Sequence, residues 1–294
     1  GHVLRWKLSG KRAVSWPRYV EVPAAEQPPE RVTTGTRITF VNHATVLIQM
    51  GGLNILTDPV WSPSVGPTSV LGQHRHKPAG IPFAALPPID LVLISHNHYD
   101  HLDLPTLQML QRRDAPLILC GLGTARLLRE HGVPRGRDLD WWQSVELGDV
   151  TVTFAPAQHW SMRGATDRNR NLWGSFYLTK DSRRIYFAGD TGAGPHFEWI
   201  RQRLGAPDVA LLPIGAYLPR WFMKPQHIDP GEAVAAAQTL GASRSVAIHF
   251  GTFQQTDEGM DDPVKELQRE LKEKRLPDNF FTVLEHGQSL TMDE

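Results

Sequence analysis

Five side chains that can bind a metal ion are concentrated in residues 96–103: three histidines and two aspartates, in a chain that has only 13 histidines. They directly follow residues 89–95, an apolar run typical of a buried strand. A hydrophobic core would reject these polar groups unless they shared a partner. Imidazole and carboxylate are the ligands that zinc, iron and manganese take in proteins. The segment therefore predicts a metal site at the carboxyl end of a strand.

The spacing within this segment favours two metal ions over one. Alternation along an extended chain would project His96 and His98 to one side, and the following turn can bring Asp100 and His101 to a second point. A catalytic zinc ion typically keeps about three protein ligands and one exchangeable water. A single ion would therefore use these four residues poorly, and we expect two centres.

Further ligands are expected at the ends of later strands. His159 in APAQHWS, Asp190 in FAGDTG and His249 in VAIHFGTF each follow an apolar strand and precede a turn. Taken singly, each of these residue types is more often a packed or capping residue than a ligand. Next to the histidine-rich segment, all three become candidate ligands.

The elements that must position these residues alternate between strands and helices. We expect three strands within residues 37–59, with a turn at Gly51 and Gly52 between the second and the third, and then a loop from 61 to 88. Asp103 or Asp100 would cap a helix over 104–113. Further strands are expected at 116–120, 150–157, 174–179, 184–190, 208–214 and 245–250, and further helices at 123–132, from 195, at 229–241 and at 263–275.

Both halves of this order contain several strands and then helices. This favours an α/β fold with two stacked, mixed β-sheets flanked by helices on their outer faces. We expect residues 1–30 to form a proline-rich N-terminal arm and residues 31–294 to form one domain.

Composition restricts the partners and the location. With 31 basic and 31 acidic residues the formal net charge is zero, so we expect no nucleic-acid partner. The single cysteine, Cys120, cannot form an internal disulfide and slightly favours a reducing compartment. No apolar run reaches about 18 residues, so no transmembrane helix is expected. We expect a soluble or peripherally membrane-associated protein, with the cytoplasm slightly favoured and a homodimer left open.

Extended stretches of the sequence resemble a known family. The motif HNHYDH with a downstream His, Asp and His resembles the metallo-β-lactamase superfamily. Within this superfamily, the sequence is most similar to the phospholipases D that hydrolyse N-acyl-phosphatidylethanolamine. The resemblance covers roughly residues 3–290 and includes NHATVLIQM, LTDP, LDWW, QHW, LWGSFYL, FAGDTG, PIGAYLPRWFMKPQHIDPGEAV and AIHFGTF.

The resemblance implies an αββα sandwich that holds two metals at one edge. It implies one metal on His96, His98 and His159 and a second on Asp100, His101 and His249, with Asp190 bridging both. Asp58 in LTDP resembles the superfamily's supporting aspartate, which would orient a ligand imidazole through its second nitrogen. A simple helix or turn cap is the alternative role for Asp58.

The implied activity is hydrolysis of N-acyl-phosphatidylethanolamine or a similar phospholipid to phosphatidic acid and N-acylethanolamine. The cofactor would be two zinc ions per chain, with iron or manganese as alternatives, and hydroxide generated by the metals would attack phosphorus. Asp100 and Asp190 would serve catalysis by holding these metals. His227 in KPQHIDP is a candidate for assisting the leaving group or contacting the phosphate, and a structural histidine is the alternative.

A mixed apolar and basic segment, residues 216–225, suits acyl chains beside an anionic headgroup. Packing of its aromatic residues in the core is an equally good interpretation. The substrate-binding candidates in it are Tyr217, Arg220, Trp221, Phe222 and Met223.

Two other functions stay open. The same metal centre would serve a lactonase, such as one acting on sugar phosphates, or another hydrolase that attacks carbonyl carbon. A catalytically silent module that binds lipid or nucleotide is the second alternative. Asp190, where a true β-lactamase would have cysteine, argues against β-lactam hydrolysis.

Overall fold

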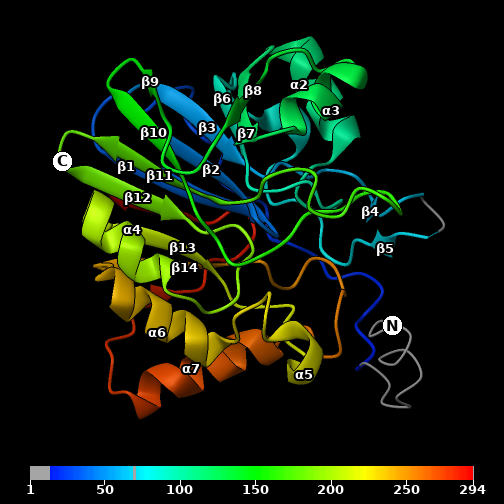
Figure 1. Ribbon diagram of the computed structural model, residues 1–294. Helices are drawn as coiled ribbons and strands as arrows, with labels where there is room; N and C mark the ends of the chain where they lie inside the picture. The colour runs from blue at the N-terminus through cyan, green and yellow to red at the C-terminus, as the bar shows by residue number, and fades with distance from the viewer. Residues whose placement is uncertain (1–13, 69–70, 294) are drawn as a thin grey trace.

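Two seven-stranded β-sheets form the centre of the computed structural model, which describes residues 14–68 and 71–293 (Figure 1). The first sheet has the order β16-β1-β2-β3-β6-β7-β8 and the second β15-β14-β13-β12-β11-β10-β9. Both are mixed, because antiparallel pairs at one side give way to parallel pairs at the other. The predicted αββα sandwich is confirmed.

The strands of the first sheet are β1 (Thr36–Asn42), β2 (Thr45–Met50), β3 (Leu53–Thr57), β6 (Leu91–Ile94), β7 (Leu117–Gly121), β8 (Gly136–Leu139) and β16 (Ser289–Met292). Those of the second are β9 (Ser144–Leu147), β10 (Val150–Ala155), β11 (Ser175–Lys180), β12 (Arg183–Phe187), β13 (Val209–Pro213), β14 (Arg244–Ile248) and β15 (Phe281–Thr282). A small hairpin of β4 (Ser64–Val65) and β5 (Gln73–His74) and a 3₁₀ turn, η1 (Phe83–Ala85), lie in the segment predicted as loop.

Helices cover the outer face of each sheet (Figure 1). α2 (Leu104–Arg113) and α3 (Thr124–Glu130) pack on the first sheet, and α4 (His196–Leu204), α6 (Pro230–Leu240) and α7 (Asp262–Glu273) lie on the side of the second. The short α5 (Arg220–Met223) precedes α6. Asp103 is the N-terminal residue before α2. Its carboxylate accepts hydrogen bonds from Trp61 N, Ser62 N and the hydroxyl of Thr106, and it makes no cap bond to a backbone N–H of the helix.

Continuous apolar strands follow from this layering, because both faces of the strand are covered. In β6, Leu91 and Leu93 face the core between the sheets, while Val92 and Ile94 face α2 and α3. The β2–β3 turn is the predicted one: Gly51 and Gly52 have φ values of 58° and 74°, a conformation that glycine adopts without steric cost. The described part of the predicted arm, residues 14–30, contains neither helix nor strand.

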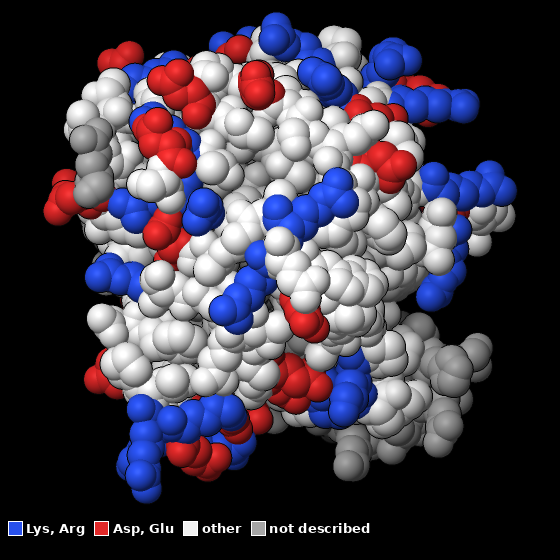
Figure 2. Space-filling model, turned by 60° about the vertical axis from the view of Figure 1, so that its left-hand side comes forward, with Lys and Arg blue, Asp and Glu red and all other residues white. Residues whose placement is uncertain are grey.

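Charged side chains of both signs alternate over the face of the molecule that Figure 2 shows, and neither sign forms a continuous patch there. Within residues 14–68 and 71–293, no helix combines the length and apolar character that crossing a membrane requires.

Candidate metal centre

One edge of the sandwich collects the residues predicted to bind metal. β6, β12 and β14 belong to parallel parts of their sheets, and β10 runs in the direction of β12 because both pair antiparallel with β11. The carboxyl ends of these strands lead into His96, His159, Asp190 and His249. Strand direction therefore brings residues from both sheets to the same edge.

The first group consists of His96, His98, His159 and Asp190, whose ligand atoms all lie within 4.8 Å of one another. His98 Nδ1 is 2.8 Å from His96 Nε2 and 3.3 Å from His159 Nε2. The Nε2 atoms of His96 and His159 are each 3.8 Å from Asp190 Oδ2. Three ring nitrogens and one carboxylate thus face one point.

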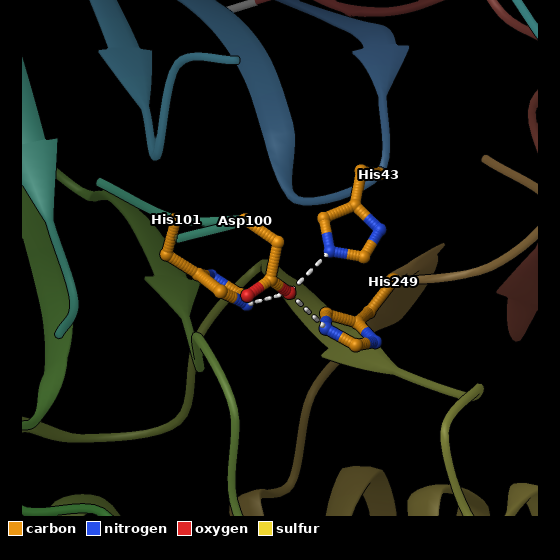
Figure 3. Close-up of side chains that lie close together, drawn as sticks. All are labelled: His43, Asp100, His101 and His249. Atoms are coloured by element: carbon orange, nitrogen blue, oxygen red, sulfur yellow. Dashed lines mark hydrogen bonds and ion pairs between the residues drawn. The ribbon is translucent and has the colours of Figure 1, made fainter. Parts of the chain in front are cut away.

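The second group contains the predicted residues Asp100, His101 and His249, together with His43 (Figure 3). Asp100 Oδ2 lies 3.1 Å from His101 Nε2 and 3.4 Å from His249 Nε2. Asp190 reaches this group as well, with Oδ2 3.1 Å from His101 Nε2 and Oδ1 3.1 Å from His249 Nε2. Asp190 therefore faces both groups, as a bridging carboxylate must.

Burial and mutual proximity keep the first group's imidazoles neutral. Burial, with the neighbouring His159, lowers the pKa of His98 to about 3, and burial lowers the pKa of His159 to about 4. Burial would raise the pKa of Asp190, but His101 and His249 outweigh it and hold that pKa well below its usual value. Neutral imidazoles and ionised carboxylates are the protonation states that bind a cation.

Several buried atoms of these residues have no hydrogen-bond partner within the described parts of the chain. They include Nε2 of His101, Nε2 of His249 and Oδ1 of Asp190. Buried polar groups normally have a partner, since an unpaired one costs about 1–3 kcal/mol. A cation in the second group would satisfy these atoms, because all three face one another there. The donor set of imidazoles and carboxylates in both groups suits zinc, iron or manganese.

Hydrogen bonds on the outer side orient the rings. Asp58, fully buried, accepts from His101 Nδ1 at 2.6 Å, from Ser95 Oγ at 2.6 Å and from Ser95 N at 2.7 Å. His159 Nδ1 lies 2.9 Å from the carbonyl oxygen of Gln226. These contacts leave Nε2 of each ring directed at the carboxylates. Asp58 makes the contact that the resemblance implied.

Left-handed backbone conformations occur beside the site at residues other than glycine. His43, Asp58, Ala216 and His249 have φ values of 47°, 32°, 61° and 60°. Such conformations cost of order 1–3 kcal/mol each and persist only where the surroundings enforce them. Here they turn the chain sharply at strand ends, so that side chains point into the edge.

His227 lies against the same cluster but outside hydrogen-bond range of Asp190. Its Nδ1 is 4.0 Å from Asp190 Oδ2, and its ring centroid is 5.1 Å from that of His159. Burial lowers the pKa of His227 well below the usual value. The neutral ring can therefore donate one hydrogen bond to a ligand at the site.

The predicted substrate segment is only partly available to a ligand. Tyr217 is buried and its hydroxyl donates to Glu266 at 2.9 Å, and Met223 is also buried, so the packing interpretation holds for both. Arg220 pairs with Glu232 at 2.6 Å and donates to the carbonyl of His227, so its guanidinium has partners within the protein. Trp221 is 48% exposed, and Phe222, next to it, is half-buried.

Two residues that contact Asp100 were not predicted from the sequence: His43 and Gln255. His43 Nε2 and Gln255 Nε2 each lie 2.8 Å from Asp100 Oδ2. The only indication of His43 in the sequence was its place between two apolar strands, in the motif NHAT. A turn histidine is ordinary, and its partner lies 57 residues away.

Comparisons with known proteins identify the family and the fold. Residues 53–250 match the family described as "Beta-lactamase superfamily domain". The chain is 35% identical over 269 residues to N-acyl-phosphatidylethanolamine-hydrolyzing phospholipase D 1 of Caenorhabditis elegans, covering 87% of this chain and 75% of the relative. It is 33% identical to the mitochondrial N-acyl-phosphatidylethanolamine-hydrolyzing phospholipase D of Saccharomyces cerevisiae, covering 85% of this chain and 54% of the relative. The structure of Igni18, a metallo hydrolase from Ignicoccus hospitalis, superimposes with a TM-score of 0.67 at 22% identity, covering 89% of this chain and all of that one.

Proposed function

The chain belongs to the beta-lactamase superfamily and is a metallo-hydrolase of that fold, and on this basis we propose that it is a phosphodiesterase of phospholipase D type. Its substrate would be N-acyl-phosphatidylethanolamine or a similar phospholipid, and its products phosphatidic acid and N-acylethanolamine. The observation that carries the proposal is Asp190, which faces two complete donor groups at once. The relatives from Caenorhabditis elegans and Saccharomyces cerevisiae, named for this activity, support the substrate class.

Two cations suit this site, and we propose zinc in both groups. His96, His98 and His159 would hold one and Asp100, His101 and His249 the other, with Asp190 shared. Bound in this way, the ions would activate water near neutral pH and neutralise charge on a phosphodiester.

In the proposed hydrolysis, residues of this chain would contact the phosphate and the acyl chains of the substrate. Oxygen from water adds to phosphorus, the bond from phosphorus to the ethanolamide oxygen breaks, and that oxygen leaves with a proton as the alcohol. The neutral ring of His227, with Nδ1 unpaired, would donate a hydrogen bond to a phosphoryl oxygen. Trp221 and Phe222 would contact the acyl chains where the substrate enters.

Zinc-loaded protein, incubated with N-acyl-phosphatidylethanolamine in detergent micelles made with ¹⁸O-water, tests this proposal by mass spectrometry. We expect phosphatidic acid and N-acylethanolamine, with ¹⁸O in phosphatidic acid only, because attack is at phosphorus. Asp190→Asn should abolish both products. Label in a fatty acid, or no phospholipid cleavage at all, would refute the proposal.

Hydrolysis at a carbonyl carbon is the competing function within the same fold. A lactone and a β-lactam offered to the same protein under identical conditions distinguish it. A preference for the lactone would replace the phospholipid proposal. Tight binding of phospholipid without turnover by fully zinc-loaded protein would favour the catalytically silent module.

A further inference from the structure

His43 approaches the second group from the turn between β1 and β2. Its side chain is 2% exposed, and its Nε2 lies 2.8 Å from Asp100 Oδ2 (Figure 3). By distance alone, His43 could be a fourth ligand in this group, because its ligand atom lies within 4.8 Å of those of Asp100, His101 and His249. Whether His43 also contacts Asp190 distinguishes a metal ligand from a residue that only supports Asp100.

The two ring ligands of this group approach both carboxylates. His101 Nε2 is 3.1 Å from Asp100 and 3.1 Å from Asp190, and His249 Nε2 is 3.4 Å from Asp100 and 3.1 Å from Asp190. Among the ion pairs of the described residues, His43 pairs with Asp100 and makes no contact with Asp190 within 4.0 Å. His43 therefore contacts Asp100 and, unlike His101 and His249, does not contact the shared carboxylate.

The backbone and the neighbouring rings hold His43 in this place. Its N–H donates to Thr252 Oγ1 at 3.0 Å, and its carbonyl accepts from His249 N at 2.7 Å. Its ring packs on His249 at 4.0 Å between centroids and edge-on against Phe253 at 5.2 Å. These contacts fix the ring while the left-handed backbone of His43 directs it at Asp100.

A second donor reaches the same oxygen from the opposite sheet. Gln255, in the loop that follows β14, donates its Nε2–H to Asp100 Oδ2 at 2.8 Å. Asp100 follows β6 of the first sheet, so its carboxylate is held between a turn of its own sheet and a loop of the other. Two donors on one oxygen fix the orientation of the carboxylate, as hydrogen bonds to metal-bound groups commonly do.

We propose that His43 is a positioning residue that donates its Nε2–H to Asp100 and stays outside the metal's ligand set. Gln255 is the second donor of the same clamp. The clamp holds the Asp100 carboxylate toward His101 and His249, so that the second ion meets a preformed site. The inference rests on the proposed function only in taking Asp100 as a metal ligand, and it requires no particular substrate.

Long-range ¹⁵N–¹H NMR of the histidine rings in zinc-loaded protein tests the first part. We expect His43 to carry its hydrogen on Nε2 and to show no metal-induced shift, in contrast to His101 and His249. A metal-shifted Nε2 in His43 would make it a ligand and overturn the proposal. Because the wild-type protein is used, this result does not depend on any variant folding.

Zinc affinity, measured by competition with a chelator, tests the second part. His43→Leu removes the donor and should weaken one of the two zinc ions about 10–100-fold, leaving the other unchanged. His43→Gln keeps an N–H near the position of Nε2 and should restore affinity to within a few-fold. Gln255→Leu should weaken the same ion, at a half-buried position that tolerates substitution.

His286→Leu is the matched control. His286 is buried, lies 3.3 Å from the same Thr252 hydroxyl and belongs to neither ligand group, so this variant should lose folding stability and keep both zinc ions. Unchanged affinity in His43→Leu and Gln255→Leu, or no rescue by His43→Gln, would overturn the proposal. Two bound zinc ions without phospholipid cleavage would instead refute the proposed substrate and leave the clamp standing.

Discussion

The substitution Asp58→Asn tests how Asp58 fixes the orientation and the tautomer of the His101 ring. In the wild type all three donors point at a carboxylate: Ser95 N at Oδ1, and Ser95 Oγ and His101 Nδ1 at Oδ2. The amide of asparagine has the same shape but only one accepting atom. Its oxygen must accept from Ser95 N–H, because a backbone N–H can only donate. Its NH₂ group then faces His101 Nδ1, which has to become an acceptor.

The consequence for metal binding follows from the ring. With Nδ1 accepting, the hydrogen of His101 moves to Nε2, the atom that faces Asp100 and Asp190 and would hold the metal. Restoring the metal-binding tautomer costs about the charge-assisted bond that was lost, about 1.5–3 kcal/mol. At about 1.4 kcal/mol per tenfold, this lowers affinity for one zinc ion roughly 10–100-fold.

Chelator competition with purified Asp58→Asn measures this loss, and Asp103→Asn provides the control. Asp103 is also buried and accepts from Ser62 N at 3.1 Å and from the hydroxyls of Ser62 and Thr106 at 2.7 and 2.6 Å. Among the residues that the structure describes, no histidine forms an ion pair or hydrogen bond with it. Both variants should lose stability, and only Asp58→Asn should lose zinc affinity. Wild-type zinc affinity in Asp58→Asn, or an equal loss in Asp103→Asn, would refute the reasoning.

Three further predictions concern turnover, capping and pH. His227→Leu should lower phospholipid turnover about 100–1,000-fold, the cost of one lost donor to a charged oxygen, with zinc content by elemental analysis unchanged. Asp229→Ala removes the capping box of α6 and should cost about 1 kcal/mol, seen as a Tm lower by about 2–4 °C in thermal unfolding. Burial lowers the pKa of His196 to about 4, so as pH falls from about 6.5 to about 4 the unfolded chain takes up this proton before the folded chain does. This residue alone should cost the metal-free protein about 3 kcal/mol in urea titrations, in addition to the loss from other buried histidines, and His196→Gln should reduce the pH dependence by that share.

The sequence was sufficient for the parts of the fold that are locally encoded. The run that became β6 is apolar on both faces, and the Gly51–Gly52 turn has its own conformational signal. His159, Asp190 and His249 could be picked out because each follows such a run, and parallel strands end at one edge. The order of the strands determines which strand ends share an edge, so it implies that these three residues lie close together.

The elements that were not predicted depend on distant partners. β8 and β16 are only partly buried and have no continuous apolar run, and β16 pairs with β1 across most of the chain. The location of Tyr217 depends on Glu266 in α7, and the role of His43 depends on Asp100. Contacts of this kind become visible only when both sheets are in place.

The edge at which both sheets meet has a consequence for the lifetime of the protein. The ligand groups that contain His43, Asp190 and His249 lie at this edge, and several of their atoms are buried without a partner among the described residues. Ions that bind only the folded chain add RT ln(1 + [L]/Kd) to its stability, about 4 kcal/mol at a thousandfold excess over Kd. The supply of the metal would thus affect how much of the polypeptide is degraded by proteases, and the abundance of the hydrolase would depend on that supply.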